Sequence, residues 1–478
     1  MLVTIEKLIY GGEGLAHDSG SAVFVPFVLP GEKVDASSTE RKKKFVRAKL
    51  DRVVEPSRER IPAPCPHFGV CGGCDYQHIP AEGQLEYKIE ILRETLRRLG
   101  RIDWTGEIKA HASPPWNYRN RAQWKVRPAA GGSNGEANAP DGGKRSGSLG
   151  GRSFISAKND VRETRSARGD VSASSPSADA QASQLGIGYF RANSTALCPV
   201  TECAILSPLL ERTLKALRAA TERGEFPKTL REIEGFVNAS DEKLLLTATF
   251  SGFPSRAAEL VEKFRAIAPQ IESLLFFDPT RERMELFGPG FIEYETLGTK
   301  YRVGHFSFFQ VNRFLVEDLA QEVTRGDEAA EPERGRLALD LFAGVGLFAA
   351  PLARRFERVI AVESNPAAAR DLEGNVRGAG AIEVRANDVE KFLERCKEKP
   401  ELVVLDPPRA GCEPGIIRSL SRMRPERITY VSCEPPTLAR DLAALREGGY
   451  EVADVQLFDL FPQTFHMETV VRLRRQAK

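Results

Sequence analysis

The sequence predicts a multidomain α/β protein, and three observations carry that prediction. At 478 residues the chain is too long for a single hydrophobic core. Short alternating strands broken by glycine turns fill residues 1–58, whereas strand and helix patterns alternate from Leu337 onward. Mixed helix and strand signals lie between these two parts. We therefore expect an N-terminal β-barrel at 1–58, an α+β central domain at 59–310 and a C-terminal doubly wound, Rossmann-like sheet at 311–478.

The composition sets broad limits on function. A net charge of +2 and a pI of about 8.1 neither demand nor exclude a nucleic-acid partner. The longest apolar run, residues 22–29, is interrupted by Pro26 and is too short to span a bilayer. The N-terminus lacks the pattern of a signal peptide, so we expect a cytoplasmic, soluble protein, and we expect it to be a monomer. Eight cysteines in such a protein are more typical of ligands or catalysts than of disulfides.

The N-terminal part predicts a small barrel of the OB kind. Its expected strands are 3–9, 22–27, 32–36 and 45–54, each bounded by a turn. Four consecutive basic residues, 41–44, followed by Arg47 and Lys49, load one hairpin with positive charge. The block is compatible with RNA binding and equally with a solvated edge protected from aggregation.

Four cysteines form a candidate metal site. Cys65, Cys71 and Cys74 have the spacing C-x5-C-x2-C, and Cys198 is a fourth candidate far downstream. Four thiolates on glycine-rich loops suit an iron-sulfur cluster. A zinc site built from the first three cysteines with His67 or His78 is an equal alternative on spacing alone.

The central part begins with a predicted helix at 82–99 and a strand at 119–127 in which basic residues alternate. Alternation places the cations on one face, where Trp124 or Tyr118 is a candidate for stacking on a base; a plain solvated strand face is the competing interpretation. Residues 128–184 are dominated by Gly, Ser, Ala and Asn, which predicts a disordered insertion.

A strand resumes at 185–190, as though the insertion were the tip of a long hairpin that pairs Val126 with Ile187. That pairing would return Cys198 to the other three cysteines. Beyond it we expect helices at 206–219 and 257–268 and strands at 230–237, 244–250 and 274–277.

The C-terminal part predicts a parallel sheet with an antiparallel edge. The expected strands are 337–342, 358–363, 382–385, 402–405, 427–432, 452–460 and 469–474, with helices between the first six. A ligand crevice in such a sheet lies at the carboxyl ends of the strands.

Polar residues and glycines follow these strand ends. The first strand ends in Asp340-Leu-Phe342-Ala-Gly344-Val-Gly346, and Glu363 ends the second, where it can accept two hydrogen bonds from a ribose diol. This glycine pattern alone is equally open to NAD. The next two strands end in Asn387-Asp388 and Asp406-Pro-Pro-Arg409.

A thiol follows the fifth strand. Cys433 stands directly after 427–432, and Pro435-Pro436 then begins a helix that runs through Leu445. Cys433 therefore lies where chemistry takes place in such sheets. Taken singly, it is also compatible with a small buried hydrophobe.

Together these strand ends resemble the class I S-adenosylmethionine-dependent methyltransferases. The segments 405–411, 432–441 and 459–471 resemble the RNA (uracil-C5)-methyltransferase family, and 11–16 with 25–32 resemble the RNA-binding TRAM domain. The resemblance covers nearly the whole chain except the insertion. It implies an RNA partner, with 23S ribosomal RNA favoured over tRNA because members that carry both a TRAM domain and the four cysteines lean that way.

The resemblance also assigns roles. It implies that Cys433 is the nucleophile that adds to C6 of uracil and that Glu468 is the base that removes the C5 proton. The residues it implies for S-adenosylmethionine are Gln310, Phe342, Glu363, Asn387 and Asp406, beside the glycine Gly344, and those for a 4Fe-4S cluster are Cys65, Cys71, Cys74 and Cys198. Leu347 departs from the family, which commonly has asparagine there.

Two other classes of protein compete with this interpretation. A non-catalytic iron-sulfur RNA-binding protein would need to keep neither Cys433 nor Glu468. An NAD oxidoreductase would have no use for the proline-rich strand-end motifs. Both alternatives are weaker than the methyltransferase.

Overall fold

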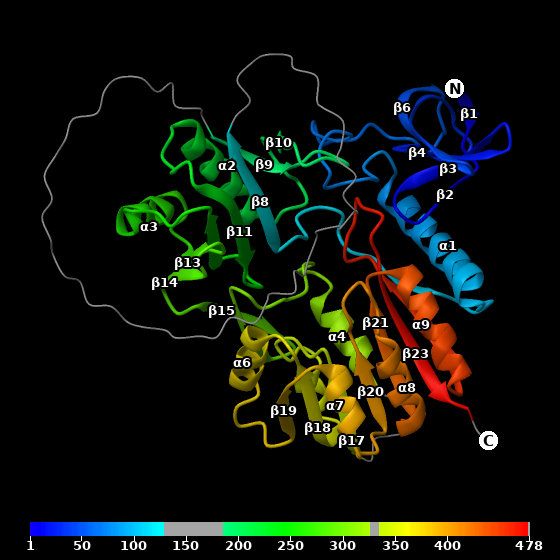
Figure 1. Cartoon of the computed structure of the whole chain (residues 1–478), viewed down its shortest axis with the longest axis vertical. Helices are drawn as coiled ribbons and strands as arrows, with labels where there is room; N and C mark the ends of the chain where they lie inside the picture. Colours follow the sequence, from blue (N-terminus) through cyan, green and yellow to red (C-terminus); the bar gives the residue numbers. More distant parts are fainter. Residues whose placement is uncertain (129–184, 326–333, 477–478) are drawn as a thin grey trace, which may run out of the picture.

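In this computed structural model the structure describes residues 1–128, 185–325 and 334–476 (Figure 1). The predicted disordered insertion lies, apart from Pro128, outside the described residues. The described chain contains a six-stranded N-terminal sheet, a seven-stranded central sheet, a two-stranded ribbon and an eight-stranded C-terminal sheet. A multidomain α/β fold is thereby confirmed.

The N-terminal sheet has the strand order β1-β5-β6-β4-β3-β2. Its strands are β1 (Leu2–Thr4), β2 (Lys7–Leu8), β3 (Glu13–Asp18), β4 (Ser21–Pro26), β5 (Lys33–Arg41) and β6 (Phe45–Glu55). Alternate side chains such as Val23, Val34 and Val46 fill its own core. The basic residues 41–44 are exposed at the turn between β5 and β6.

The central sheet has the order β10-β9-β8-β11-β12-β13-β14. Its elements are β8 (Arg121–Pro128), β9 (Leu185–Phe190), β10 (Leu197–Pro199), α2 (Pro208–Glu222), β11 (Leu230–Val237), β12 (Leu244–Phe250), α3 (Ala257–Ile267), β13 (Ile271–Asp278) and β14 (Arg283–Phe287). Val126 pairs with Ile187 in antiparallel register, so the predicted hairpin is confirmed. Cys198 on β10 pairs with Tyr189 on β9.

The expectation that Trp124 or Tyr118 stacks on a base is wrong. Both side chains are fully buried, and their polar atoms are occupied: Trp124 Nε1 lies 3.1 Å from Tyr189 Oη, and Tyr118 Oη donates to Pro462 O at 3.0 Å. The cations of β8 are also engaged within the protein, since Lys125 pairs with Glu232 and Arg121 with Glu234. The aromatic side chains of this strand serve the core rather than a ligand.

The C-terminal sheet has the order β19-β18-β17-β20-β21-β23-β22-β7. Its strands are β7 (Lys109–His111), β17 (Gly335–Leu341), β18 (Phe356–Glu363), β19 (Ile382–Ala386), β20 (Leu402–Leu405), β21 (Arg427–Ser432), β22 (Tyr450–Phe458) and β23 (Glu468–Arg475). The intervening helices are α5 (Ala349–Leu352), α6 (Pro366–Asn375), α7 (Val389–Arg395), α8 (Pro414–Met423) and α9 (Pro435–Glu447). The predicted parallel sheet with an antiparallel edge is present, with β23 antiparallel to both β21 and β22.

The N-terminal third of the chain joins this sheet in two places that the sequence did not indicate. Strand β7 adds to its edge, parallel to β22. Helix α1 (Ala81–Gly100) lies beside α9, and Leu92 and Leu96 share one core with Leu438 and Leu442 (Figure 1). The opposite face of the sheet is covered by α4 (Val316–Thr324), α5 and α6. The ribbon of β15 (Phe291–Thr296) and β16 (Thr299–Gly304) packs beside α6. The division at residues 58 and 310 stays a prediction.

Among the described residues, no helix has both the length and the apolar character needed to cross a bilayer.

Candidate active site

Two neighbouring strands bring Cys433 close to Glu468. Strands β21 and β23 run antiparallel, and their last pair at this end joins Ser432 to Thr469. Cys433 directly follows Ser432 and Glu468 directly precedes Thr469, and the Glu468 carboxyl lies close enough to raise the pKa of the Cys433 thiol. Opposite residues in an antiparallel pair project to the same side of the sheet and lie close together. Two residues separated by 35 positions in the sequence therefore lie close together in the fold.

The two groups influence each other's protonation. Burial and the nearby Glu468 carboxyl together raise the pKa of the Cys433 thiol to about 12, while Arg409 opposes the rise. Burial likewise raises the pKa of Glu468 well above its usual range, with Asp406 adding to the effect and Arg409 again opposing it. The raised pKa favours the protonated thiol, which would have to lose its proton before it could act as a nucleophile.

The glycine loop after β17 leaves room for a ligand. Phe342 and Gly344 have φ values of +65° and +55°, and a Cβ added to Gly344 would meet no atom within 4 Å. The Glu363 carboxylate accepts hydrogen bonds from Gly344 N at 2.8 Å and Asn365 N at 2.6 Å. These bonds hold the loop and the carboxylate together, and each oxygen keeps a second lone pair for a ligand hydroxyl.

Buried carboxylates gather beside this loop. Asp340 is fully buried and neither of its oxygens has a hydrogen-bond partner among the described residues. Burial, Asp406 and Glu363 raise its pKa to about 8. Burial and Glu363 raise the pKa of Asp406 to about 7. Carboxyl groups so short of partners form an environment that favours a cationic ligand. Asp340 belongs to the motif noted in the sequence, but sequence reasoning gave it no role.

The other residues expected at the donor site lie at the same edge or near it. Asn387 is exposed after β19, and its backbone N donates to Glu363 O at 3.0 Å. Gln310 is buried in the segment before α4, where its carbonyl accepts from Asn120 Nδ2. Leu347 is buried in the core of the sheet, and its carbonyl accepts from Tyr301 Oη at 3.4 Å.

Sequence reasoning gave no role to two residues that border Cys433. Arg409, after β20, is close enough to lower the pKa values of both Cys433 and Glu468. Tyr10, in the turn between β2 and β3, donates to Glu434 Oε2 at 3.0 Å and lies 3.5 Å from Cys433 O. Its ring meets Phe465 edge-on, with centroids 5.4 Å apart. The motif Asp406-Pro-Pro-Arg409 could have pointed to Arg409, but nothing in the sequence linked Tyr10 to Cys433.

The four predicted cysteine ligands lie in one region. The segment 65–74 packs on the β9–β10 hairpin. Gly72 N donates a hydrogen bond to Phe190 O, and the backbones of Cys71 and Arg191 form an isolated antiparallel β-bridge. Burial raises the pKa of Cys71 to about 12, and its neighbours Cys198, Cys203 and Cys65 add to the rise. Among the described residues, however, no three His, Cys, Asp or Glu side chains are arranged to hold a metal ion.

The histidines of the alternative zinc site have other partners. His67 Nε2 accepts a hydrogen bond from Thr201 N at 3.0 Å. His78 is buried, its Nε2 lies 3.3 Å from Val28 O, and burial lowers its pKa to about 4.

Comparison with known proteins agrees with this geometry. The family model described as tRNA (Uracil-5-)-methyltransferase matches residues 295–476. An uncharacterized RNA methyltransferase of Aquifex aeolicus is 31% identical over 98% of this chain and 97% of its own length, and one of Halalkalibacterium halodurans is 29% identical over 98% and 96%. The crystal structure of the Pyrococcus abyssi tRNA (uracil-54, C5)-methyltransferase with S-adenosyl-L-homocysteine shares the fold, with a TM-score of 0.68, 22% identity and coverage of 99% of this chain and 100% of that one. The strand-end motifs, the full-length relatives and the shared fold agree, and the chain belongs to the S-adenosylmethionine-dependent RNA (uracil-C5)-methyltransferase family.

Proposed function

We propose that this enzyme forms 5-methyluridine at a specific uridine of 23S ribosomal RNA through a covalent adduct between Cys433 and C6 of the base. The observation that carries the proposal is the pairing of β21 with β23, which brings the Cys433 thiol and the Glu468 carboxyl group close together at the carboxyl end of β21.

The thiol has to activate the ring, because C5 of uracil is too weak a nucleophile to take a methyl group from a sulfonium unaided. The Cys433 thiol gives its proton to solvent as the sulfur bonds to C6, and the C5=C6 electron pair moves to form an enolate at C4. Its raised pKa makes a free thiolate rare, so addition and deprotonation are coupled. Arg409 is the nearby cation that favours the anionic forms.

The enolate carbon C5 then bonds to the donor methyl group, and S-adenosylhomocysteine leaves as a neutral thioether. The Glu468 carboxylate removes the C5 proton, the C5=C6 bond re-forms and the Cys433 sulfur leaves C6. A raised pKa suits this base, because a carboxylate that binds protons tightly abstracts them more readily. The acid form of Glu468 must lose its proton before each such step.

The strand ends next to the glycine loop provide the donor site. Gly344 lets the ligand approach the backbone, Glu363 is positioned for the ribose, and Gln310, Phe342, Asn387 and Asp406 complete the set. S-adenosylmethionine carries a sulfonium and an ammonium group. The carboxyl group of Asp340, which has no hydrogen-bond partner among the described residues, and that of Asp406, whose pKa is also raised, are suited to such a cation, which would lower their pKa values.

The RNA would meet the N-terminal sheet, for which we propose a TRAM-type role. A stacked uracil cannot reach Cys433, so the target base must be flipped out or lie in a loop. The side chains of residues 41–44 are exposed to solvent, where they can meet phosphates, whereas Arg121 and Lys125 of β8 pair with glutamates of β11. The combination of this basic sheet with four cysteines favours 23S RNA, and tRNA is the alternative target.

We further propose that Cys65, Cys71, Cys74 and Cys198 hold a 4Fe-4S cluster. The proximity of the thiols supports this proposal, since Cys198 and Cys65 both influence the pKa of Cys71, and bound iron would offset the cost of ionising them. The engagement of His67 and His78 elsewhere weighs against zinc. A brown protein with stoichiometric iron and sulfide is the expected product of anaerobic purification; a colourless protein with one zinc per chain would contradict the proposal.

Mapping of 5-methyluridine in 23S RNA and tRNA from a strain lacking the gene tests the function. One site in 23S RNA should lose its methyl group, and expression of the wild-type chain, but not of the Cys433→Ala variant, should restore it. Loss confined to a tRNA position would assign the alternative target. An unchanged pattern in both RNAs would refute the proposal.

A further inference from the structure

The segment 459–467 joins β22 to β23 and leads directly to Glu468, the first residue of β23. Its backbone is held in an unusual conformation. Gln463 has a φ of +69°, in the left-handed region that side chains other than glycine seldom occupy. Such a conformation persists only where surrounding contacts impose it. Those contacts come from parts of the chain that are distant in sequence.

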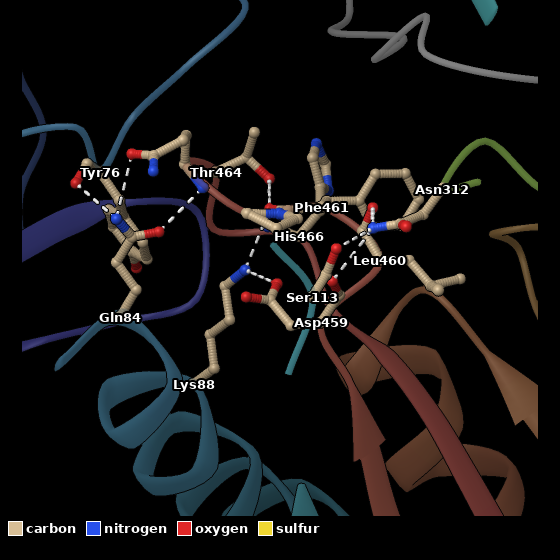
Figure 2. Close-up of polar contacts among 12 residues, drawn as sticks. Tyr76, Gln84, Lys88, Ser113, Asn312, Asp459, Leu460, Phe461, Thr464 and His466 are labelled. Carbon is tan, nitrogen blue, oxygen red and sulfur yellow. Dashed lines mark hydrogen bonds and ion pairs between the residues drawn. The ribbon is translucent and has the colours of Figure 1, made fainter. Parts of the chain in front are cut away.

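Gln84 of α1 holds the apex of this segment. Its Oε1 accepts from Gln463 N at 2.8 Å, and its Nε2 lies 3.1 Å from Gln463 Oε1. The same Nε2 is 2.8 Å from Ile79 O and 3.2 Å from Tyr76 O (Figure 2). The carbonyl of Gln463 accepts from the backbone N atoms of Asp75 and Tyr76 at 2.9 and 3.0 Å. The backbone and side chain of Gln463 are thus bound on one side by α1 and the segment before it.

Lys88, one helical turn further on, holds the start of the segment. Its Nζ donates to Asp459 Oδ1 at 2.6 Å and to Phe461 O at 3.1 Å (Figure 2). The Lys88 side chain is fully buried and that of Asp459 is nearly so. Burial lowers the pKa of Lys88, and Asp459 and Asp75 counteract this effect. If the helix and the segment separated, Lys88 and Asp459 would each become a buried charge without a partner, which is costly.

The opposite side of the segment is held by the residues that follow Gln310. Asn312 Nδ2 donates to Leu460 O at 3.1 Å and to Ser113 Oγ at 2.8 Å, and it lies 3.5 Å from Asp459 O (Figure 2). Within the segment, Thr464 Oγ1 donates to Phe461 O at 2.9 Å and lies 3.2 Å from His466 N. The chain therefore reaches Glu468 along a path fixed on both sides.

We propose that Gln84 and Lys88 are positioning residues that fix the 459–467 segment so that Glu468 faces the reacting carbon. The inference rests on the proposed function, because it concerns the step assigned to Glu468. General-base catalysis requires the carboxylate to lie within hydrogen-bonding reach of the proton it removes. A misplacement of about 1 Å costs about 10²-fold in rate.

The role predicts a selective defect. In Gln84→Ala, C5 deprotonation should slow by about 10- to 100-fold, while addition of Cys433 and the first methyl transfer stay within about threefold of wild type. Methylated RNA–protein adduct should accumulate on denaturing gels, and RNA deuterated at C5 of the target uridine should show a larger isotope effect on turnover. The matched control is Glu86→Gln, on the exposed face of the same helix, which should behave as wild type.

Lys88→Met tests the second contact, and a double variant guards against a folding defect. The single change leaves Asp459 buried without its partner, whereas Lys88→Met combined with Asp459→Asn removes the unpaired charge. The double variant should fold more stably than the single one and still accumulate adduct. A role in stability alone would lower the melting temperature and the active fraction but slow every step in proportion, with no adduct, and would overturn the inference.

The Glu468→Gln variant separates failure of the inference from failure of the proposed function. If Glu468→Gln accumulates adduct and Gln84→Ala does not, only the positioning role is refuted. If Glu468→Gln turns over normally, the assignment of the base itself falls.

Discussion

The two sides of the active site come from opposite ends of the chain and contribute different things. The C-terminal sheet provides the side chains with proposed chemical roles, Cys433, Glu468 and Asp406, each at a strand end. The N-terminal 100 residues provide Tyr10, Gln84 and Lys88, which bind the loops that carry those groups. One sheet can therefore place the reactive groups, whereas their precise alignment depends on contacts from elements remote in sequence.

This comparison predicts graded effects. Substitutions in the sheet should abolish individual steps, and substitutions on the N-terminal side should slow the same steps by smaller factors. The variants below test that order from the largest effect to the smallest.

Cys433→Ala should have the largest effect, since every later step requires the bond to C6. Turnover should fall by at least about 10³-fold, and no covalent RNA adduct should form. Methyl transfer to the RNA and adduct on denaturing gels are the measurements. Cys396→Ala, which removes a partly buried cysteine after α7, is the control expected to keep wild-type activity. Methyl transfer at the wild-type rate by Cys433→Ala would contradict the mechanism.

Glu468→Gln should come next, because it stops the reaction after the methyl group has been transferred. Turnover should fall by about 10²–10⁴-fold, and a methylated adduct stable to denaturation should accumulate. Mass spectrometry of the trapped species checks that the RNA carries the methyl group. Glu451→Gln, exposed on β22, is the matched control. Unimpaired turnover would remove Glu468 from the role of base.

Asp340→Asn should weaken donor binding in a pH-dependent manner. Because burial raises the pKa of Asp340 to about 8, the wild-type side chain is neutral at pH 6 and mostly charged at pH 9. The variant should therefore bind S-adenosylmethionine about tenfold more weakly at pH 9, which corresponds to about 1.4 kcal/mol, and nearly equally at pH 6. Calorimetric titration at both pH values measures this, with Glu373→Gln, exposed on α6, as control.

The raised pKa of Asp340 also predicts how the stability of the donor-free protein depends on pH. A carboxyl group whose pKa is raised by folding binds its proton more tightly in the folded state. Its contribution to stability therefore falls as pH rises from about 4 toward 8. Asp340→Asn should raise the melting temperature of the donor-free protein at pH 9 and leave it nearly unchanged at pH 4. If the melting temperatures of variant and wild type differed equally at both pH values, the change in stability would not come from ionisation of Asp340.

The reactive edge was predictable because the signals for it are local. Each parallel strand is a short apolar run followed at once by its polar or thiol residue, as at Glu363, Asp406 and Cys433, so the strand pattern alone places those residues at one edge. The antiparallel position of β23 then follows from the last two strands. Pairing of Val126 with Ile187 was predictable for a similar reason, since the strand pattern resumes after the insertion.

The remaining contacts depend on tertiary packing that no local pattern reports. Strand β7 has three residues, and its partner β22 lies more than 300 residues further along the chain. The alternation of β8 does not distinguish a stacking aromatic from a core one, and Trp124 proved to be core. Sequence reasoning gave Gln84 and Lys88 no role. Their spacing from Leu92 and Leu96, four residues at each step, was the available sign that they share the buried face of α1.

Tyr10→Phe should have the smallest effect and bears most directly on the comparison. The change keeps the ring against Phe465 and removes only the hydroxyl that donates to Glu434, next to Cys433. Loss of one hydrogen bond of about 1 kcal/mol should slow adduct formation by about fivefold. Glu434 should also bind its proton more tightly, because the bond from Tyr10 lowers its pKa.

Rapid quenching of a single turnover measures that step for Tyr10→Phe. Tyr87→Phe is the matched control, since Tyr87 also donates to a glutamate, Glu59, at 2.8 Å but on the exposed side of α1. Adduct formation should be unchanged in the control. If Tyr10→Phe behaves like Tyr87→Phe, the N-terminal sheet merely packs against the active site. A selective defect would show instead that the sheet proposed to hold the RNA also aligns the thiol that attacks it.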